Sequence, residues 1–224
     1  LIAKSDLCIA NSEYLATYCR KYNARSVNVG QGCDIESFKD VNNAKPYDLK
    51  HLKGPIIGYV GVVSASRLDV DIILHIAKEY IDYQIVLVGP EDDVFGASKL
   101  HDLKNVHFLG QKEVSDLPVY INTFDICINP QVVNAITRGN YPRKIDEYLA
   151  LGKPVVATRT ETMEFFSDFV YLADDKKDYI KLIDLAIQED NEERRLARKD
   201  FAFGHTWENS VQEMKNEINS LLKA

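Results

Sequence analysis

Strand-like and helix-like segments alternate along most of this chain, and this alternation limits its fold more than any other feature. Apolar runs at 56–63 and 84–90 predict buried strands, and a segment with helical apolar spacing at 72–80 separates them. Strands that are joined by helices in this order form a parallel sheet with both faces covered. The sequence therefore predicts an α/β fold with a Rossmann-like, doubly wound parallel sheet.

The same patterns continue towards the end of the chain. Further strands are predicted at 106–110, 124–129, 155–158 and 169–172. Helices are predicted at 113–122, 176–189, 192–201 and 208–222. Such sheets bind ligands beyond the carboxyl ends of their strands, so we expect the loops at Gly61, at Gly110 and at 129–143 to converge on one site.

A smaller β-α-β unit is predicted in the first 40 residues, with the helix caps Asn11 and Ser12 between its first strand and its helix. One such unit cannot bury both faces of its strands. We therefore expect this chain to be a piece of a longer protein. Residues 1–40 would be the remnant of its N-terminal domain, together with the segment that crosses into the next domain. A linker is expected at 41–54, the Rossmann-like domain at 55–204, and a C-terminal helix at 205–224 that packs back towards the other domain.

A loop, a short helix and a strand are predicted between 134 and 158. Pro142 suits the first turn of this helix and Gly152 suits its end. Arg143 and Lys144 then stand in the first turn, where unpaired N–H groups and the helix dipole favour an anion, so we expect a negatively charged ligand there. The alternative is that both cations only form surface pairs with Glu147, each worth about 0.3 kcal/mol.

Composition and motif searches argue against several other classes of protein. A net charge of −7 without a basic cluster argues against nucleic-acid binding. The sequence contains no apolar stretch of 18 residues and no GxGxxG, P-loop or Gly-x-Ser-x-Gly motif after a strand. Asp69 and Asp71 could hold a divalent metal, but carboxylates also suit the helix start expected there, so we predict neither a metal site nor a cofactor. The four cysteines have no metal-ligand spacing, which predicts reduced thiols in a cytoplasmic protein.

The segment from 134 to 156 resembles the donor-site signature of a known enzyme family. The matching positions are Asn134, Thr137, Arg138, Pro142, Lys144, Glu147, Tyr148, Ala150 and Gly152–Val156. This signature is similar to that of the retaining glycosyltransferases of the two-Rossmann-domain (GT-B) architecture, family four. Segments 58–69, 86–90 and 105–111 resemble the first strands of that family's C-terminal domain, and 6–12 and 30–34 resemble the end of its N-terminal domain and the crossing.

The resemblance implies a role for each matching side chain. Glu147 would accept hydrogen bonds from the nucleotide ribose, because a carboxylate can take two O–H donors at once. Arg67 and Lys144, with Arg143 beside them, would hold the donor diphosphate. Asn134 and Thr137 would contact the sugar hydroxyls. Backbone groups at 110–113 would meet the base.

Two positions depart from the family pattern. Gly139 stands where the family carries a first glutamate, and Val62 stands where many members carry a phosphate-binding arginine. Branches of the family with a Pro-x-Lys turn ahead of the helix lack that glutamate too, which the resemblance explains as a subfamily difference. The acceptor pocket of the family lies in the N-terminal domain, so we expect the catalytic groups on the acceptor side to be outside this chain.

We therefore predict an enzyme that transfers a sugar, with retention of configuration, from a nucleoside diphosphate, most simply UDP, to a glycan or lipid-linked acceptor of the cell surface. The nucleotide sugar is a substrate, no metal takes part, and this chain by itself would be inactive. A cytoplasmic location is expected, at the inner face of the membrane if the other domain binds lipid. Two alternatives stay open: a nucleotide-sugar epimerase of the same architecture, and a non-catalytic docking module that kept the fold.

Overall fold

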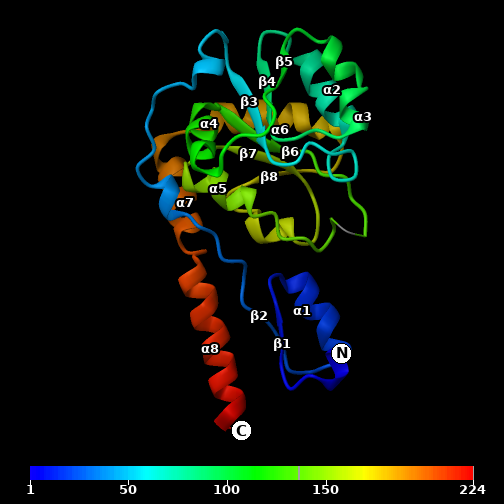
Figure 1. Ribbon diagram of the computed structural model, residues 1–224, viewed down its shortest axis with the longest axis vertical. Helices are drawn as coiled ribbons and strands as arrows, with labels where there is room; N and C mark the ends of the chain where they lie inside the picture. The colour runs from blue at the N-terminus through cyan, green and yellow to red at the C-terminus, as the bar shows by residue number, and fades with distance from the viewer. Residues whose placement is uncertain (136, 224) are drawn as a thin grey trace.

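The computed structural model describes residues 1–135 and 137–223 and contains one large and one small parallel sheet (Figure 1). The large sheet has the strand order β5-β4-β3-β6-β7-β8, and every neighbouring pair is parallel. Its strands are β3 (Ile56–Val60), β4 (Gln84–Val88), β5 (Val106–Phe108), β6 (Ile126–Asn129), β7 (Val155–Thr158) and β8 (Tyr171–Ala173). The predicted Rossmann-like, doubly wound sheet is therefore confirmed.

Helices cover both faces of the large sheet. They are α2 (Val70–Glu79), α3 (Asp93–Gly96), α4 (Leu117–Thr123), α5 (Lys144–Ala150), α6 (Lys176–Glu189) and α7 (Glu192–Phe203). Side chains of β3 alternate between the two faces, because Ile57 packs with α2, α3 and α6 whereas Ile56 packs with α4, α5 and α7. All five residues of β3 are buried, as expected for a central parallel strand.

The described part of the chain also contains six short 3₁₀ helices outside the strands and α-helices. They span Ile2–Lys4, Glu36–Phe38, Tyr47–Leu49, Lys99–Asp102, Val114–Asp116 and Met163–Phe166. The helix predicted at 113–122 begins as one of them, and α4 itself starts at Leu117 with Pro118 in its first turn. Two others lie in the polar stretch before the large sheet, where Leu49 and Leu52 are buried in the same apolar cluster as α4 and α5. The predicted linker thus packs against the large domain.

The helix α5 differs from its prediction at one end only. Pro142 precedes the helix, and Arg143 is the N-cap residue, so Lys144 is the first helical residue. The helix ends as predicted at Gly152, which has a positive φ of 71°. The Lys153 N–H donates to Tyr148 O at 3.0 Å and the Gly152 N–H donates to Leu149 O at 2.8 Å, which is the Schellman arrangement.

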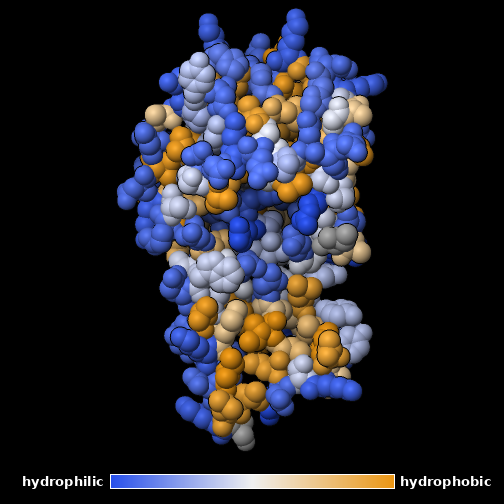
Figure 2. All heavy atoms as spheres, in the orientation of Figure 1, coloured by the Kyte–Doolittle hydropathy of each residue, from blue (hydrophilic) through white to orange (hydrophobic). Residues whose placement is uncertain are grey.

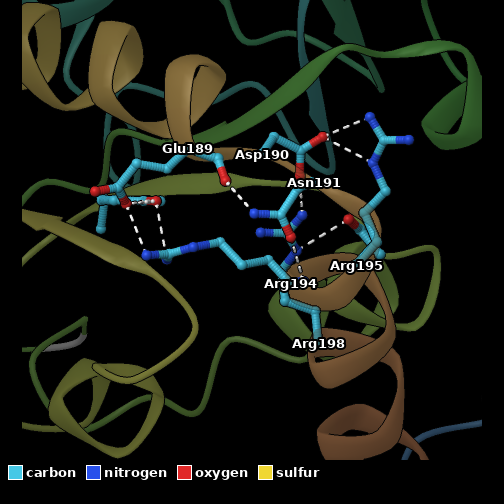
Figure 3. A network of polar contacts seen from close by, with 8 residues as sticks. Glu189, Asp190, Asn191, Arg194, Arg195 and Arg198 are labelled. Atoms are coloured by element: carbon cyan, nitrogen blue, oxygen red, sulfur yellow. Dashed lines mark hydrogen bonds and ion pairs between the residues drawn. The ribbon is translucent and has the colours of Figure 1, made fainter.

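A polar network joins the end of α6 to α7 (Figure 3). The side chain of Arg198 is only 3% exposed, and its Nε donates to Gly152 O at 2.9 Å. Its guanidinium also pairs with Asp190, which Arg195 contacts at 2.7 Å. Glu189 pairs with Arg194 at 3.0 Å in the same network. The bond from Arg198 to Gly152 O ties α7 to the C-terminal end of α5, and the other pairs join the end of α6 to α7.

The smaller unit consists of β1 (Cys8–Ala10), α1 (Glu13–Arg20) and β2 (Ser26–Asn28), with two parallel strands. The last helix, α8 (Trp207–Lys223), leaves the large domain and extends beside this unit (Figure 1). Trp207 and Met214 of α8 line an apolar hollow together with Ile9 and Leu15. Figure 2 shows apolar residues gathered at this lower end of the molecule. The direction of α8 agrees with the expected packing towards the N-terminal side, and the domain boundaries stay a prediction.

Candidate functional site

A cavity of about 360 Å³, lined by both charged and apolar side chains, opens at the carboxyl ends of β3 and β6. The chain runs outward from β3 through β4 and β5, and then returns to β6 beside β3 and runs outward on the other side. This reversal of strand order leaves a crevice at the strand ends, where doubly wound sheets bind ligands. The cavity is lined by residues at 59–61, 67–68, 114, 117, 129, 131, 137, 140–144 and 147.

Lys144 reaches the cavity from the start of α5. Its Nζ lies 2.8 Å from the hydroxyl of Tyr59 and 4.4 Å from the centroid of the Tyr59 ring, on the neighbouring strand β3. Gly61 leaves room for this ammonium group, because a Cβ at that position would lie 3.0 Å from Lys144 Nζ. Its φ of 141° also favours glycine. The ring and the hydroxyl therefore hold the cation in one place at the cavity wall.

Arg143 and Glu147 stand one turn apart at the same opening. Arg143 Nη2 lies 3.8 Å from Glu147 Oε1, and the two side chains are 55% and 19% exposed. Burial raises the pKa of Glu147 above its ordinary value, although Arg143 and Lys144 lower it in part. No hydrogen bond to the Glu147 carboxylate is present in the part of the chain that the structure describes, so its oxygens face the cavity with a free capacity to accept.

Arg67 lies across the cavity, on the loop that follows β3. It is exposed, and within residues 1–135 and 137–223 its guanidinium pairs with no carboxylate. Of the charged residues that line the cavity, Arg67, Arg143 and Lys144 are cations and Glu147 is the one acid among the residues described. The structure thus brings Arg67, Lys144 and Glu147 to one cavity, which has an excess of positive charge suited to an anion with more than one negative charge.

Asn134 and Thr137 build the loop beside the cavity. The Thr137 N–H donates to Asn134 Oδ1 at 3.0 Å, and Asn134 Nδ2 donates to the carbonyl of Ser66 at 3.1 Å. The Thr137 hydroxyl donates to Val132 O and accepts from the Asn134 N–H at 3.0 Å. Thr137 is among the residues that line the cavity, and Asn134 is not. Their contact with a sugar stays a prediction.

Several cavity residues were not singled out by the sequence analysis. Asn129 ends β6, and its side chain donates to Gln131 Oε1 at 3.3 Å, while Gln131 Nε2 donates to Thr137 O at 2.9 Å. A signal for Asn129 was present, because a polar residue that ends a buried parallel strand lies at the ligand edge of the sheet. Tyr59 gave no such signal, since it stands inside an apolar run. Val114 and Leu117 line the cavity, whereas residues 110–113, whose backbone groups we expected to meet the base, are not among its lining residues.

Asp146, a buried residue of α5, connects this helix to two other segments of the chain. Its carboxylate is fully buried and lies 2.8 Å from His205 Nδ1, and it accepts from Cys33 Sγ at 3.4 Å. Burial and the nearby carboxylate raise the pKa of the Cys33 thiol. Cys33 belongs to the segment that joins the small unit to the large domain, His205 belongs to the segment between α7 and α8, and the Cys33 N–H donates to His205 O at 3.0 Å. Through Asp146, the helix that carries Lys144 and Glu147 is thereby bonded to both of these segments.

Metal and membrane features were searched in the same described residues. Within 1–135 and 137–223 there is no group of three or more His, Cys, Asp or Glu side chains that could hold a metal ion. The carboxylate of Asp69 caps α2 by accepting from the N–H groups of Asp71 and Ile72, as its position in the sequence predicts. No helix among these residues has the length and apolar character needed to cross a membrane.

Comparisons with known proteins agree with this geometry. Residues 54–188 match the family model described as "Glycosyl transferases group 1". The chain is 27% identical over 179 residues to a putative teichuronic acid biosynthesis glycosyltransferase, TuaH, of Bacillus subtilis, covering 76% of this chain and 45% of that protein. The chain therefore spans about half the length of this curated relative.

Solved structures share the fold at low sequence identity. The crystal structure of Anabaena Alr3699/HepE in complex with UDP superimposes with a TM-score of 0.79 at 18% identity, over 96% of this chain and 64% of that one. Sucrose-phosphate synthase from Thermosynechococcus elongatus gives a TM-score of 0.74 at 19% identity, over 99% of this chain and 60% of that one. These similarities are those of the GT-B architecture expected from the sequence, with this chain corresponding to its C-terminal half.

Proposed function

Because this chain belongs to the group 1 glycosyltransferases, we propose that it supplies the donor-binding part of an enzyme that transfers a sugar from UDP to a glycan or a lipid-linked acceptor. The observation that carries the proposal is the cavity at the strand ends, whose lining brings together Arg67, Lys144 and Glu147. An excess of positive charge suits a diphosphate, and a carboxylate with free acceptor capacity suits the ribose diol. The complexes of HepE with UDP support the choice of nucleotide.

The chemistry asked of these residues is stabilisation of the leaving group. When the bond between the sugar and the diphosphate breaks, a negative charge develops on the phosphate oxygen that leaves. Arg67, Arg143 and Lys144 would stabilise that charge, and Tyr59 holds Lys144 in place beforehand. We propose that these side chains replace a metal ion in this role. Retention of configuration, and a lack of turnover by this chain without an acceptor-binding domain, belong to the same proposal.

The acceptor side and the location are proposed from weaker support. The relative TuaH bears the name of a teichuronic acid biosynthesis enzyme, which supports a role in cell-surface polysaccharide synthesis. Such an acceptor would be assembled at the inner face of the cytoplasmic membrane, so we propose a cytoplasmic enzyme that associates with the membrane through regions other than those described here. The proposal includes no nucleic-acid partner and no cofactor, as expected from the sequence.

Calorimetric titration of this chain with UDP, GDP and free glucose tests the proposal. We expect UDP to bind, and we expect Arg67→Ala, Lys144→Ala and Glu147→Ala each to weaken binding about 10-fold or more, since each removes a charged contact worth about 1.5–3 kcal/mol. Lys215→Ala removes an exposed cation of α8 and serves as the matched control. Absence of nucleotide binding, or binding that the three cavity variants leave unchanged, would refute the donor site and favour the docking module.

A further inference from the structure

The small unit contacts the loop between β6 and α5 at Gly139. Ser12, the N-cap residue of α1, donates its hydroxyl hydrogen to the carbonyl of Gly139 at 3.2 Å, in a buried hydrogen bond between residues 127 positions apart. The ring of Tyr14, in the first turn of α1, lies against the α-carbon of the same glycine. We call Ser12, Tyr14 and Gly139 the α1 seam. It joins the small unit to the loop between β6 and α5.

The ring of Tyr14 explains why position 139 is a glycine. A Cβ built on Gly139 would lie 2.3 Å from Cδ1 and 2.5 Å from Cε1 of Tyr14, closer than side-chain atoms can approach. The backbone of Gly139 itself is ordinary, because it is not among the glycines with positive φ. A side chain is therefore excluded at this position by one aromatic ring and by no backbone strain. Gly152 is the opposite case, with a φ of 71°.

The loop that carries Gly139 forms part of the cavity wall. Its neighbours Thr137 and Asn140 line the cavity. Within the loop, Gln131 Nε2 donates to Thr137 O at 2.9 Å. The rest of the large domain holds the loop through Thr162 Oγ1, which donates to Arg138 O at 3.1 Å, and through the Ser66 carbonyl, which accepts from Asn134 Nδ2 at 3.1 Å. The α1 seam supplies a support from the other unit, on the far side of the loop. The loop that forms this wall is therefore in contact with both units.

We propose that Ser12 and Tyr14 are positioning residues for the donor sugar, because both contact the loop that forms part of the cavity wall. This inference rests on the proposed function, because it takes the ligand of the cavity to be a nucleotide sugar. It assigns to the small unit a part in shaping the donor site. Since docking of α1 and binding of the sugar both favour the same loop conformation, each stabilises the other.

A double-mutant cycle between positions 14 and 139 tests the seam. Gly139→Ala, Tyr14→Ala and the double variant are compared by thermal unfolding and by titration with UDP and with UDP-glucose. Gly139→Ala should weaken UDP-glucose binding about 10-fold, because forced overpacking displaces the loop, and should change UDP binding less than about 3-fold. The double variant should bind UDP-glucose as well as Tyr14→Ala does and more tightly than Gly139→Ala does, since the alanine methyl group then has room. Gly96→Ala is the control, because a Cβ there meets no atom within 4 Å.

Variants of Ser12 separate the seam from the helix cap. Ser12 also accepts a hydrogen bond from the Leu15 N–H at 3.4 Å. Ser12→Asp keeps this acceptor but cannot donate to Gly139 O, so it should weaken UDP-glucose binding. Ser12→Thr keeps both hydrogen bonds and should bind UDP-glucose as the wild type does. The seam has no positioning role if Gly139→Ala has the melting temperature and the UDP-glucose affinity of the wild type. The same conclusion follows if the double variant binds UDP-glucose no better than Gly139→Ala. If the wild type binds neither ligand, the proposed function fails first and the positioning role with it.

Discussion

The replacement Glu147→Gln should have opposite effects on ligand binding and on stability. In the folded chain the Glu147 side chain is 19% exposed, and its nearest ion-pair contact, to Arg143, is 3.8 Å long. Such a pair between helix positions i and i+4 is worth about 0.3–0.5 kcal/mol. The pKa of Glu147 is nevertheless raised, with burial as the largest cause. The folded state as a whole therefore disfavours the ionised carboxylate.

The pH dependence follows from the sign of that shift. Because the pKa of Glu147 is higher in the folded than in the unfolded chain, the folded chain binds more protons between the two values. The free energy of unfolding then falls as the pH rises from the ordinary glutamate pKa of about 4.3 through the raised folded value. Glutamine carries no charge at any pH. At pH 8 the variant should be more stable by an amount on the order of 1 kcal/mol, about 2–4 °C in melting temperature for a chain of this size.

Thermal unfolding at a series of pH values, together with UDP titration at pH 8, measures both effects. We expect the stability difference between Glu147→Gln and the wild type to vanish below about pH 4. UDP affinity should fall about 10-fold or more, because an amide accepts from the ribose hydroxyls more weakly than a carboxylate. Glu213→Gln, on the exposed surface of α8, is the matched control. A variant that is less stable than the wild type at pH 8, by an amount that does not change with pH, would contradict the reasoning.

Three further predictions concern the cavity wall, the contact of α7 with the end of α5, and the buried thiols. Tyr59→Phe keeps the ring beneath Lys144 but loses the 2.8 Å hydrogen bond, so UDP affinity should fall about 3–10-fold, and Tyr59→Leu should lower it further in the same titration. Arg198→Met should lower the free energy of unfolding in urea by about 3–5 kcal/mol, because it leaves Asp190 with one partner fewer and Gly152 O without its donor; an effect below about 1 kcal/mol would refute this account. Thiol labelling of the native chain should modify Cys8 and Cys19 before Cys33 and Cys127, because burial raises the pKa of the latter two thiols; mass mapping of the labelled sites checks the order.

The glycosyltransferase resemblance drawn from the residues at 134–156 is confirmed by the family match. The combination of motifs was sufficient for this, although no single motif was. The roles of Asn134 and Thr137 towards a sugar, and the effects of Gly139 and Val62 on activity, stay predictions. Val62 is 52% exposed and does not line the cavity.

Features that depend on neighbours in the sequence could be predicted without a structure. The strand β7 and the helix α6 have the predicted bounds, because an apolar run and a helical apolar period are local patterns. The cap at Asp69 and the glycine that ends α5 are also local, since each bonds to groups within a few residues. The order of these elements was enough to predict the sheet and the edge at which the cavity opens.

Contacts between distant segments were decided only by the tertiary structure. Tyr59 and Lys144 are 85 positions apart, and Ser12 and Gly139 are 127 positions apart, so no periodicity or spacing could pair them. The polar stretch at 41–54 looked like a linker because its few apolar residues are scattered, yet Leu49 is fully buried once α4 and α5 offer it a surface. The physical reason is the same in each case: a side chain's partners across the fold depend on how the elements pack, and local sequence sets only the elements.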